Sequence, residues 1–71
     1  MRYQVGDIVR VIDKNAFYYN AIGQISEITN NDYLVIFTAI DNDTGEYFVY
    51  EDCYYYDYQL KEEILWQLYK Q

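Results

Sequence analysis

Two short runs of alternating apolar residues constrain the fold of this 71-residue chain more than any other feature. In residues 8–12, isoleucine and valine occupy both faces of an extended segment, and in residues 22–28 they recur with one irregularity. The second run contains Gly23, and a glycine is expected where a bent strand passes close to a crossing strand. The pattern therefore predicts a strand, an irregular loop and a second strand that is kinked near Gly23.

The middle of the chain continues as β-structure. Residues 29–32 predict a turn, because Asn and Asp tolerate a left-handed backbone and bond to neighbouring amides. Residues 33–40 carry apolar side chains on both faces, as a central strand does. A hairpin loop at residues 41–45, with its glycine at the position of positive φ, then leads to a fourth strand over residues 46–50.

The C-terminal third has a different character. Residues 51–58 hold four tyrosines and three acids, and we expect them to form a connection. The apolar positions 60, 64 and 68 then fall on one helical stripe, with Asp57 as a plausible N-cap. This pattern predicts a C-terminal helix over about residues 59–70. A fifth strand near residues 59–64 is the alternative.

Length and composition indicate one domain spanning residues 1–71. The chain is 52% hydrophobic, which argues against disorder, and 11 of these residues are tyrosines that can keep a hydroxyl in water. No apolar run approaches the roughly 20 residues that a membrane-spanning helix needs. The single cysteine, Cys53, cannot form an internal disulfide. We therefore expect a cytoplasmic protein that does not insert into membranes.

The charge distribution is the strongest compositional signal. Twelve acidic and five basic residues give a net charge of -7, and neither Lys nor Arg occurs between Lys14 and Lys61. Such a surface repels nucleic acid, whose binding depends on neutralising phosphates, and attracts a basic protein. The alternative is that the acids only provide solubility.

Three consecutive aromatic residues, Phe17, Tyr18 and Tyr19, occupy the loop between the first two strands. Three adjacent rings cannot all face one core, so at least one is expected on the surface. That ring either covers one end of a barrel or contacts a partner.

The segments 9–12, 17–20 and 22–23, with the alternating strand that follows, resemble the small SH3-like barrels of the KOW type. Over about residues 5–37 the chain looks most like the photosystem I reaction-centre subunit IV family. The resemblance implies a non-catalytic docking subunit built as a five-stranded barrel. The ferredoxin-facing surface of that family is basic, whereas this chain is acidic. The expected fold is mainly β: an SH3-like barrel of four to five antiparallel strands over about residues 5–50, followed by a short C-terminal helix.

Neither catalysis nor metal binding is expected. The chain has no histidine, the commonest general base. Its carboxylate pairs lie on turns, which lack the buried environment that makes one carboxyl group an acid and the other a base. Residues 41–46 superficially resemble a calcium loop, but Gly45 is one place early and the twelfth position, Asp52, holds Asp instead of the bidentate Glu. An ordinary acidic turn is the preferred interpretation, and no cofactor is expected.

Two functional hypotheses follow. The first is an acidic inhibitor that docks on a basic nucleic-acid-binding protein as a nucleic-acid mimic, in the manner of phage anti-restriction or anti-CRISPR proteins. The second is a structural accessory subunit of a larger complex. A homodimer or tight hetero-complex through Tyr54, Tyr55, Tyr56, Trp66 and Tyr69 is also expected, because so many tyrosines exceed what a small core holds. The predicted partner-binding residues are Asp41, Asp43, Glu46, Glu51, Asp52, Tyr54, Tyr55, Tyr56 and Asp57.

Overall fold

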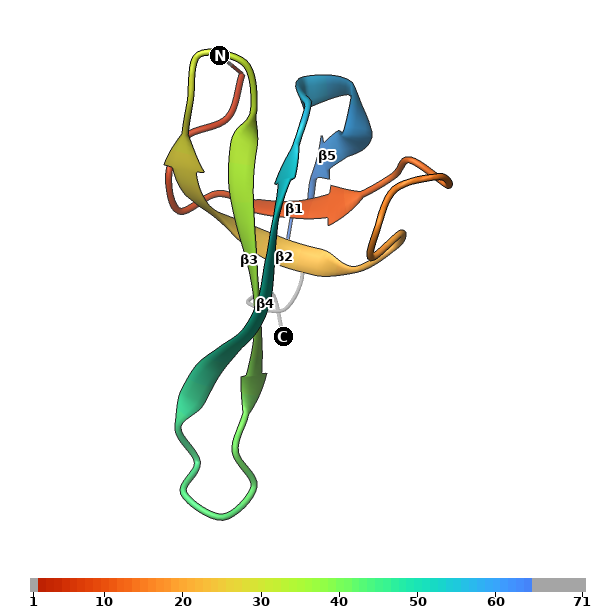
Figure 1. The fold of residues 1–71 in the computed structure, drawn as a ribbon. Coiled ribbons are helices and arrows are strands. Elements are labelled where there is room, and N and C mark those ends of the chain that lie inside the picture. The colour runs from red at the N-terminus through yellow and green to blue at the C-terminus, as the bar shows by residue number, and fades with distance from the viewer. Residues whose placement is uncertain (1, 65–71) are drawn as a thin grey trace.

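The computed structural model describes residues 2–64 and contains a single antiparallel sheet of five strands (Figure 1). The spatial order of the strands is β4-β3-β2-β1-β5, so β4 and β5 are the edges within this part of the chain. A single turn of 3-10 helix, η1, precedes the last strand. In chain order the elements are β1 (Ile8–Val11), β2 (Ile22–Ile28), β3 (Tyr33–Ile40), β4 (Tyr47–Tyr55), η1 (Asp57–Gln59) and β5 (Leu60–Glu62).

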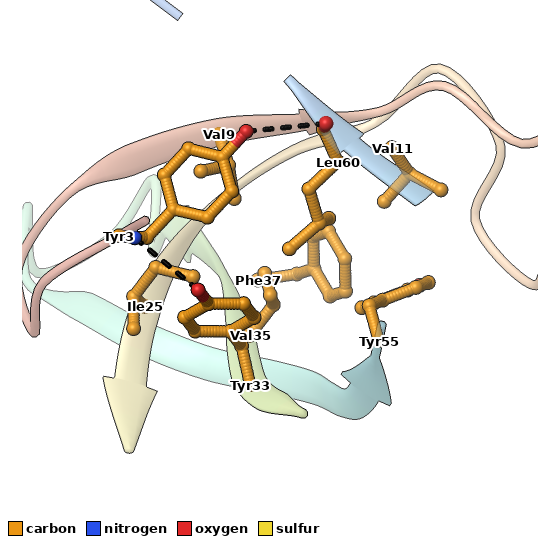
Figure 2. Packing of buried hydrophobic residues seen from close by; sticks show 9 residues of the cluster. All are labelled: Tyr3, Val9, Val11, Ile25, Tyr33, Val35, Phe37, Tyr55 and Leu60. Carbon is orange, nitrogen blue, oxygen red and sulfur yellow. Dashed lines mark hydrogen bonds between the residues drawn. The ribbon is translucent and has the colours of Figure 1, made fainter. Parts of the chain in front are cut away.

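One hydrophobic core takes side chains from every strand (Figure 2). Because all five strands direct one face toward this core, the sheet bends around it. The hydroxyl of Tyr3 donates to the carbonyl oxygen of Leu60 at 3.1 Å, and the hydroxyl of Tyr33 accepts from the Tyr3 amide at 3.2 Å. These bonds satisfy two tyrosine hydroxyls that burial would otherwise penalise. The buried residues are Tyr3, Val9, Val11, Ile25, Tyr33, Val35, Phe37, Tyr55 and Leu60.

Gly23 lies where two strands approach closely, as predicted. A Cβ atom at this position would lie 2.5 Å from Cγ1 of Val35 and 2.7 Å from the carbonyl oxygen of Ile36. The kink predicted near Gly23 lies elsewhere. The register shifts between Ile25 and Glu27, so the irregular spacing of the isoleucines in β2 comes from a bulge at Ser26.

The second and third strands have the predicted limits, and β1 ends at Val11 instead of residue 12. The fourth strand is longer than predicted. β4 continues to Tyr55, so most of the tyrosine-rich segment predicted as a connection is a strand that pairs with β3. The predicted turn at residues 41–45 is present, with Gly45 at φ +74°.

The predicted C-terminal helix is wrong for the described residues 59–64. Gln59 ends η1, and β5 pairs with β1 so that Leu60 lies opposite Val11 and enters the core. Burial of Leu60 in the sheet outweighs the helical spacing of the apolar residues. Asp57 is the first residue of η1, and Tyr56 takes the N-cap position. The alternative fifth strand is therefore confirmed at Leu60–Glu62. Residues 65–70 lie outside the described part of the chain.

Candidate protein-docking surface

The hairpin of β3 and β4 extends well beyond the rest of the sheet (Figure 1). β2 pairs with β3 only as far as the Gln24–Ile36 pair, whereas β3 and β4 stay paired up to Ile40 and Tyr47. Beyond Ile36, each of these two strands therefore has only the other as a partner within the described residues. We call residues 38–49 the arm. A two-stranded ribbon is marginally stable in water without a covered apolar face.

Both faces of the arm are apolar and exposed. Directly paired residues share a face, so Ile40, Tyr47 and Val49 lie on the face opposite the core, while Phe48 lies on the other face beside Ala39. Tyr47 is 74% exposed, and Ile40 and Val49 are 52% and 53% exposed. An apolar surface of this kind on a small chain is characteristic of an interaction site.

A bulge separates the arm from the rest of β4. Phe37 pairs with Glu51 and Thr38 pairs with Val49, so Tyr50 is the extra residue and is 55% exposed. Bulges bend and twist a strand locally. Because of the extra residue, even-numbered residues of β4 such as Phe48 lie on the core side in the arm. In the segment that ends at Tyr55, the odd-numbered residues do so instead.

The turn at the end of the arm is built by Asp41. Its Oδ1 accepts from the amide of Asp43 at 2.8 Å and from the amide of Thr44 at 3.3 Å, while its carbonyl oxygen accepts from Gly45 at 2.7 Å. These bonds give Asp41 a structural role in the turn. Asp43 and Glu46 are exposed beside it and leave their carboxylates facing water.

The predicted acidic residues fall into separate groups. Asp41, Asp43 and Glu46 lie together at the end of the arm, and Asp52 is exposed on the outer face of β4, beside Ile36. Asp57 lies away from them in η1, where it forms an ion pair of 2.8 Å with Arg2. The arm acids therefore form the candidate acidic surface, with Asp52 on the outer face of the same strand. Glu51 lies on the opposite face, paired with Phe37, and Asp57 lies in η1.

The part of the sequence that forms this surface contains no basic residue. No Lys or Arg occurs between Lys14 and Lys61, and the two arginines are held elsewhere, Arg2 by Asp57 and Arg10 by Glu63 at 2.8 Å. The arm therefore carries carboxylates without neighbouring cations on its own strands. Its field attracts a positively charged surface.

The aromatic loop covers one end of the core. Tyr18 has a positive φ of 60°, and its ring packs on Phe37 with centroids 5.2 Å apart. Hydrogen bonding to Glu51 raises the pKa of the Tyr18 hydroxyl. Phe17, at 79% exposure, points away, which confirms that at least one ring of this loop lies on the surface.

The predicted tyrosine contacts need one correction. Tyr55 is 2% exposed and belongs to the core, because it lies opposite the buried Tyr33 in the β3–β4 ladder. Tyr54 and Tyr56 are exposed and remain available to a partner. Trp66 and Tyr69 lie outside the described residues. Sequence reasoning missed Ile40, Tyr47, Phe48 and Val49, although the near absence of polar residues from both faces of this hairpin was a usable signal.

The calcium-loop interpretation of the turn concerns residues 41–46 and Asp52. In residues 2–64 no group of three His, Cys, Asp or Glu side chains is arranged to hold a metal ion. The hairpin strand that begins at Tyr47 also separates Asp52 from the acidic turn. An open groove of about 590 Å³ lies between the N-terminal segment and β5, lined by residues that include Arg2, Tyr58 and Lys61.

No protein-family model matches this chain, and no curated protein is significantly similar to it. Within residues 2–64, no helix has the length and apolar character to cross a membrane.

Proposed function

We propose that this protein is a non-enzymatic acidic binding protein that docks on a basic nucleic-acid-binding protein, with its carboxylates in the place of phosphates. The observation that carries the proposal is the coincidence of two features on the arm. The segment without Lys or Arg includes the whole arm, and the same arm exposes apolar and aromatic side chains. Carboxylates steer the encounter, and the aromatic side chains supply contact area that excludes water.

The fold supports a docking role. We propose that the bent five-stranded sheet is an SH3-like barrel, left open at β4 and β5, that acts as a rigid base for the arm. Protection of a phage from restriction or CRISPR nucleases is a role that suits such a small acidic chain, because these nucleases present basic nucleic-acid grooves.

The apolar faces of the arm favour a second candidate, a permanent accessory subunit of a larger complex like photosystem I subunit IV. Permanent interfaces are more apolar than transient ones, and Ile40, Tyr47 and Val49 would fit such an interface. Salt separates the two candidates. A mimic loses affinity steeply as salt rises, whereas an apolar permanent interface changes little.

The test uses a panel of purified restriction and CRISPR nucleases, with inhibition of DNA cleavage as the readout. The variant Asp43→Lys/Glu46→Lys changes the two exposed acids at the end of the arm. Its matched control, Glu27→Lys/Glu62→Lys, makes the same change in net charge at exposed positions of β2 and β5. We expect the parent and the control to inhibit at least one nuclease and the arm variant to lose inhibition. Equal inhibition by both variants, or no inhibition by the parent across the panel, contradicts the proposal.

A further inference from the structure

The free edge of the arm is the part of the molecule that the proposed function leaves unexplained. β4 is an edge strand in the described residues, and over the arm its only partner is β3. An edge strand exposes unpaired main-chain N–H and C=O groups, and an extended segment of another chain can pair with them. The two apolar faces of the arm would then contact the side chains of that segment.

The turn fixes which groups of β4 point to this edge. The amide of Asp41 donates to the carbonyl oxygen of Glu46 at 2.8 Å, so these two groups point toward each other across the ladder. Pairs alternate along an antiparallel ladder. The next pair, Ile40 with Tyr47, is therefore non-hydrogen-bonded, and so is the pair of Thr38 with Val49. The N–H and C=O groups of Tyr47 and Val49 are thus directed outward, away from β3.

Charge disfavours one way in which a second copy of this chain could occupy the edge. If two β4 strands paired antiparallel about Glu51, that carboxylate would lie directly opposite the same residue of the other copy. Like charges directly opposite one another destabilise a strand pair. Acids at Glu46 and Asp52, with no Lys or Arg on the same strand, favour an added strand with basic side chains.

We propose that the arm binds a basic partner by strand addition, in which an extended lysine- or arginine-containing segment pairs with the outward N–H and C=O groups of Tyr47 and Val49. The inference rests on the proposed function and adds to it the mode of binding. Main-chain hydrogen bonds give the contact its register. The exposed carboxylates of Glu46 and Asp52, on either side of these residues, select positively charged side chains in the added strand.

The test removes one outward N–H group and leaves every side chain in place. The 71-residue chain is made by chemical ligation with N-methylvaline at position 49, and a second chain carries N-methylphenylalanine at position 48 as a control. The probe is a fluorescent twelve-residue peptide of alternating lysine and valine, and its partner control alternates glutamate and valine. Binding is measured by anisotropy, and amide hydrogen exchange is followed by NMR.

We expect the parent to bind the lysine peptide, and the Val49 methylation to weaken binding by about tenfold or more without altering the fold. The amides of Tyr47 and Val49 should exchange rapidly in the free protein and slowly in the complex. Methylation at Phe48 should instead disturb the β3–β4 ladder, because that N–H points inward. Equal binding by the Val49-methylated chain, failure of the lysine peptide to bind, or slow exchange at Tyr47 and Val49 in the free protein overturns the inference.

Two further results separate this inference from the proposed function. If the Val49-methylated chain still inhibits a nuclease that the arm-charge variant no longer inhibits, the mimic function stands and strand addition fails. If sedimentation shows that the parent is a dimer and that methylation at Val49 dissociates it, a second copy of the chain occupies the edge. The proposal of a basic partner segment is then wrong.

Discussion

The hydroxyl of Tyr55 donates a hydrogen bond of 2.6 Å to the carbonyl oxygen of Phe17, 38 residues earlier in the chain. This bond fastens the end of β4 to the aromatic loop. Burial raises the pKa of Tyr55, so its hydroxyl stays protonated and remains a donor at neutral pH. The ring also meets Phe37 edge to face, with centroids 6.3 Å apart. Tyr55 thus anchors the edge strand to the core and is not available to a partner.

Replacing Tyr55 with Phe should lower the free energy of unfolding by about 1–2 kcal/mol, because the Phe17 carbonyl loses its donor in a partly buried place. The matched control is Tyr54→Phe, at an exposed position of the same strand, where the change should stay within about 0.5 kcal/mol. Urea unfolding followed by circular dichroism measures both. Equal stability of the two variants would show that the bond contributes nothing.

Gly23→Ala should be the most damaging glycine substitution. The new methyl group would lie 2.5 Å from Cγ1 of Val35, and overpacking of this kind typically costs about 1–3 kcal/mol. Gly45→Ala meets no atom within 4 Å and bears only the strain of a positive φ, so its cost should be about 1 kcal/mol or less. Thermal unfolding compares the two variants.

A double mutant tests the cause of the Gly23 effect. Val35→Ala removes the nearest side-chain atom, so the combined variant should be more stable than the sum of the single losses predicts. Simple additivity would place the clash on the backbone oxygen of Ile36 instead.

The local strand patterns of the sequence were sufficient for most of the fold. The alternation of side chains predicted the limits of β2 and β3, because successive residues of a strand point to opposite faces of the sheet. The C-terminal segment misled because Leu60, Ile64 and Leu68 also fit a helical stripe. Only the long-range pairing of Leu60 with Val11 decides for a strand, and a contact between such distant residues leaves no local signal.

The candidate site was predictable in its charge and not in its shape. The absence of cations is plain in the sequence, and the acids at the turn were placed correctly at the end of a hairpin. The extent of the arm depends on where β2 stops pairing with β3, and the role of Tyr55 depends on a bulge at Tyr50. Both are properties of the assembled sheet.

The ion pair of Arg10 with Glu63 gives a pH-dependent contribution to stability. Two bonds of 2.8 and 3.2 Å join the side chains, and bonding to Arg10 lowers the pKa of Glu63 below its ordinary 4.5. A lowered pKa in the folded state adds stability above the ordinary pKa, and that stability is lost as pH falls through the folded value.

Glu63→Gln should therefore be less stable than the parent at pH 7, and the difference should disappear in strongly acidic solution. The comparison is made against the parent at each pH, because the loss of the chain's net negative charge also changes stability. Glu62→Gln, an exposed neighbour, is the control and should show a smaller difference. Urea unfolding at several pH values measures the curves. A difference that stays constant with pH would mean that Glu63 acts through packing alone.

Rates of binding should separate the two kinds of arm residue. Exposed carboxylates act over distance, so Asp43→Lys/Glu46→Lys should mainly slow association, and this effect should shrink as added salt shortens the screening length to about 8 Å. The uncharged Tyr47 side chain affects binding only when it touches the partner. If its ring enters the partner surface, Tyr47→Ala should mainly speed dissociation and weaken binding by about 2 kcal/mol.

Tyr58→Ala is the matched control for Tyr47, because the two rings are 71% and 74% exposed and Tyr58 lies in η1, outside the arm. Neither change should alter the free energy of unfolding by more than about 0.5 kcal/mol, since both rings are largely in water. Association and dissociation are measured by surface plasmon resonance on the nuclease that the parent inhibits. If Tyr58→Ala weakens binding as much as Tyr47→Ala, the contact surface extends over η1 and the arm is not the main docking element.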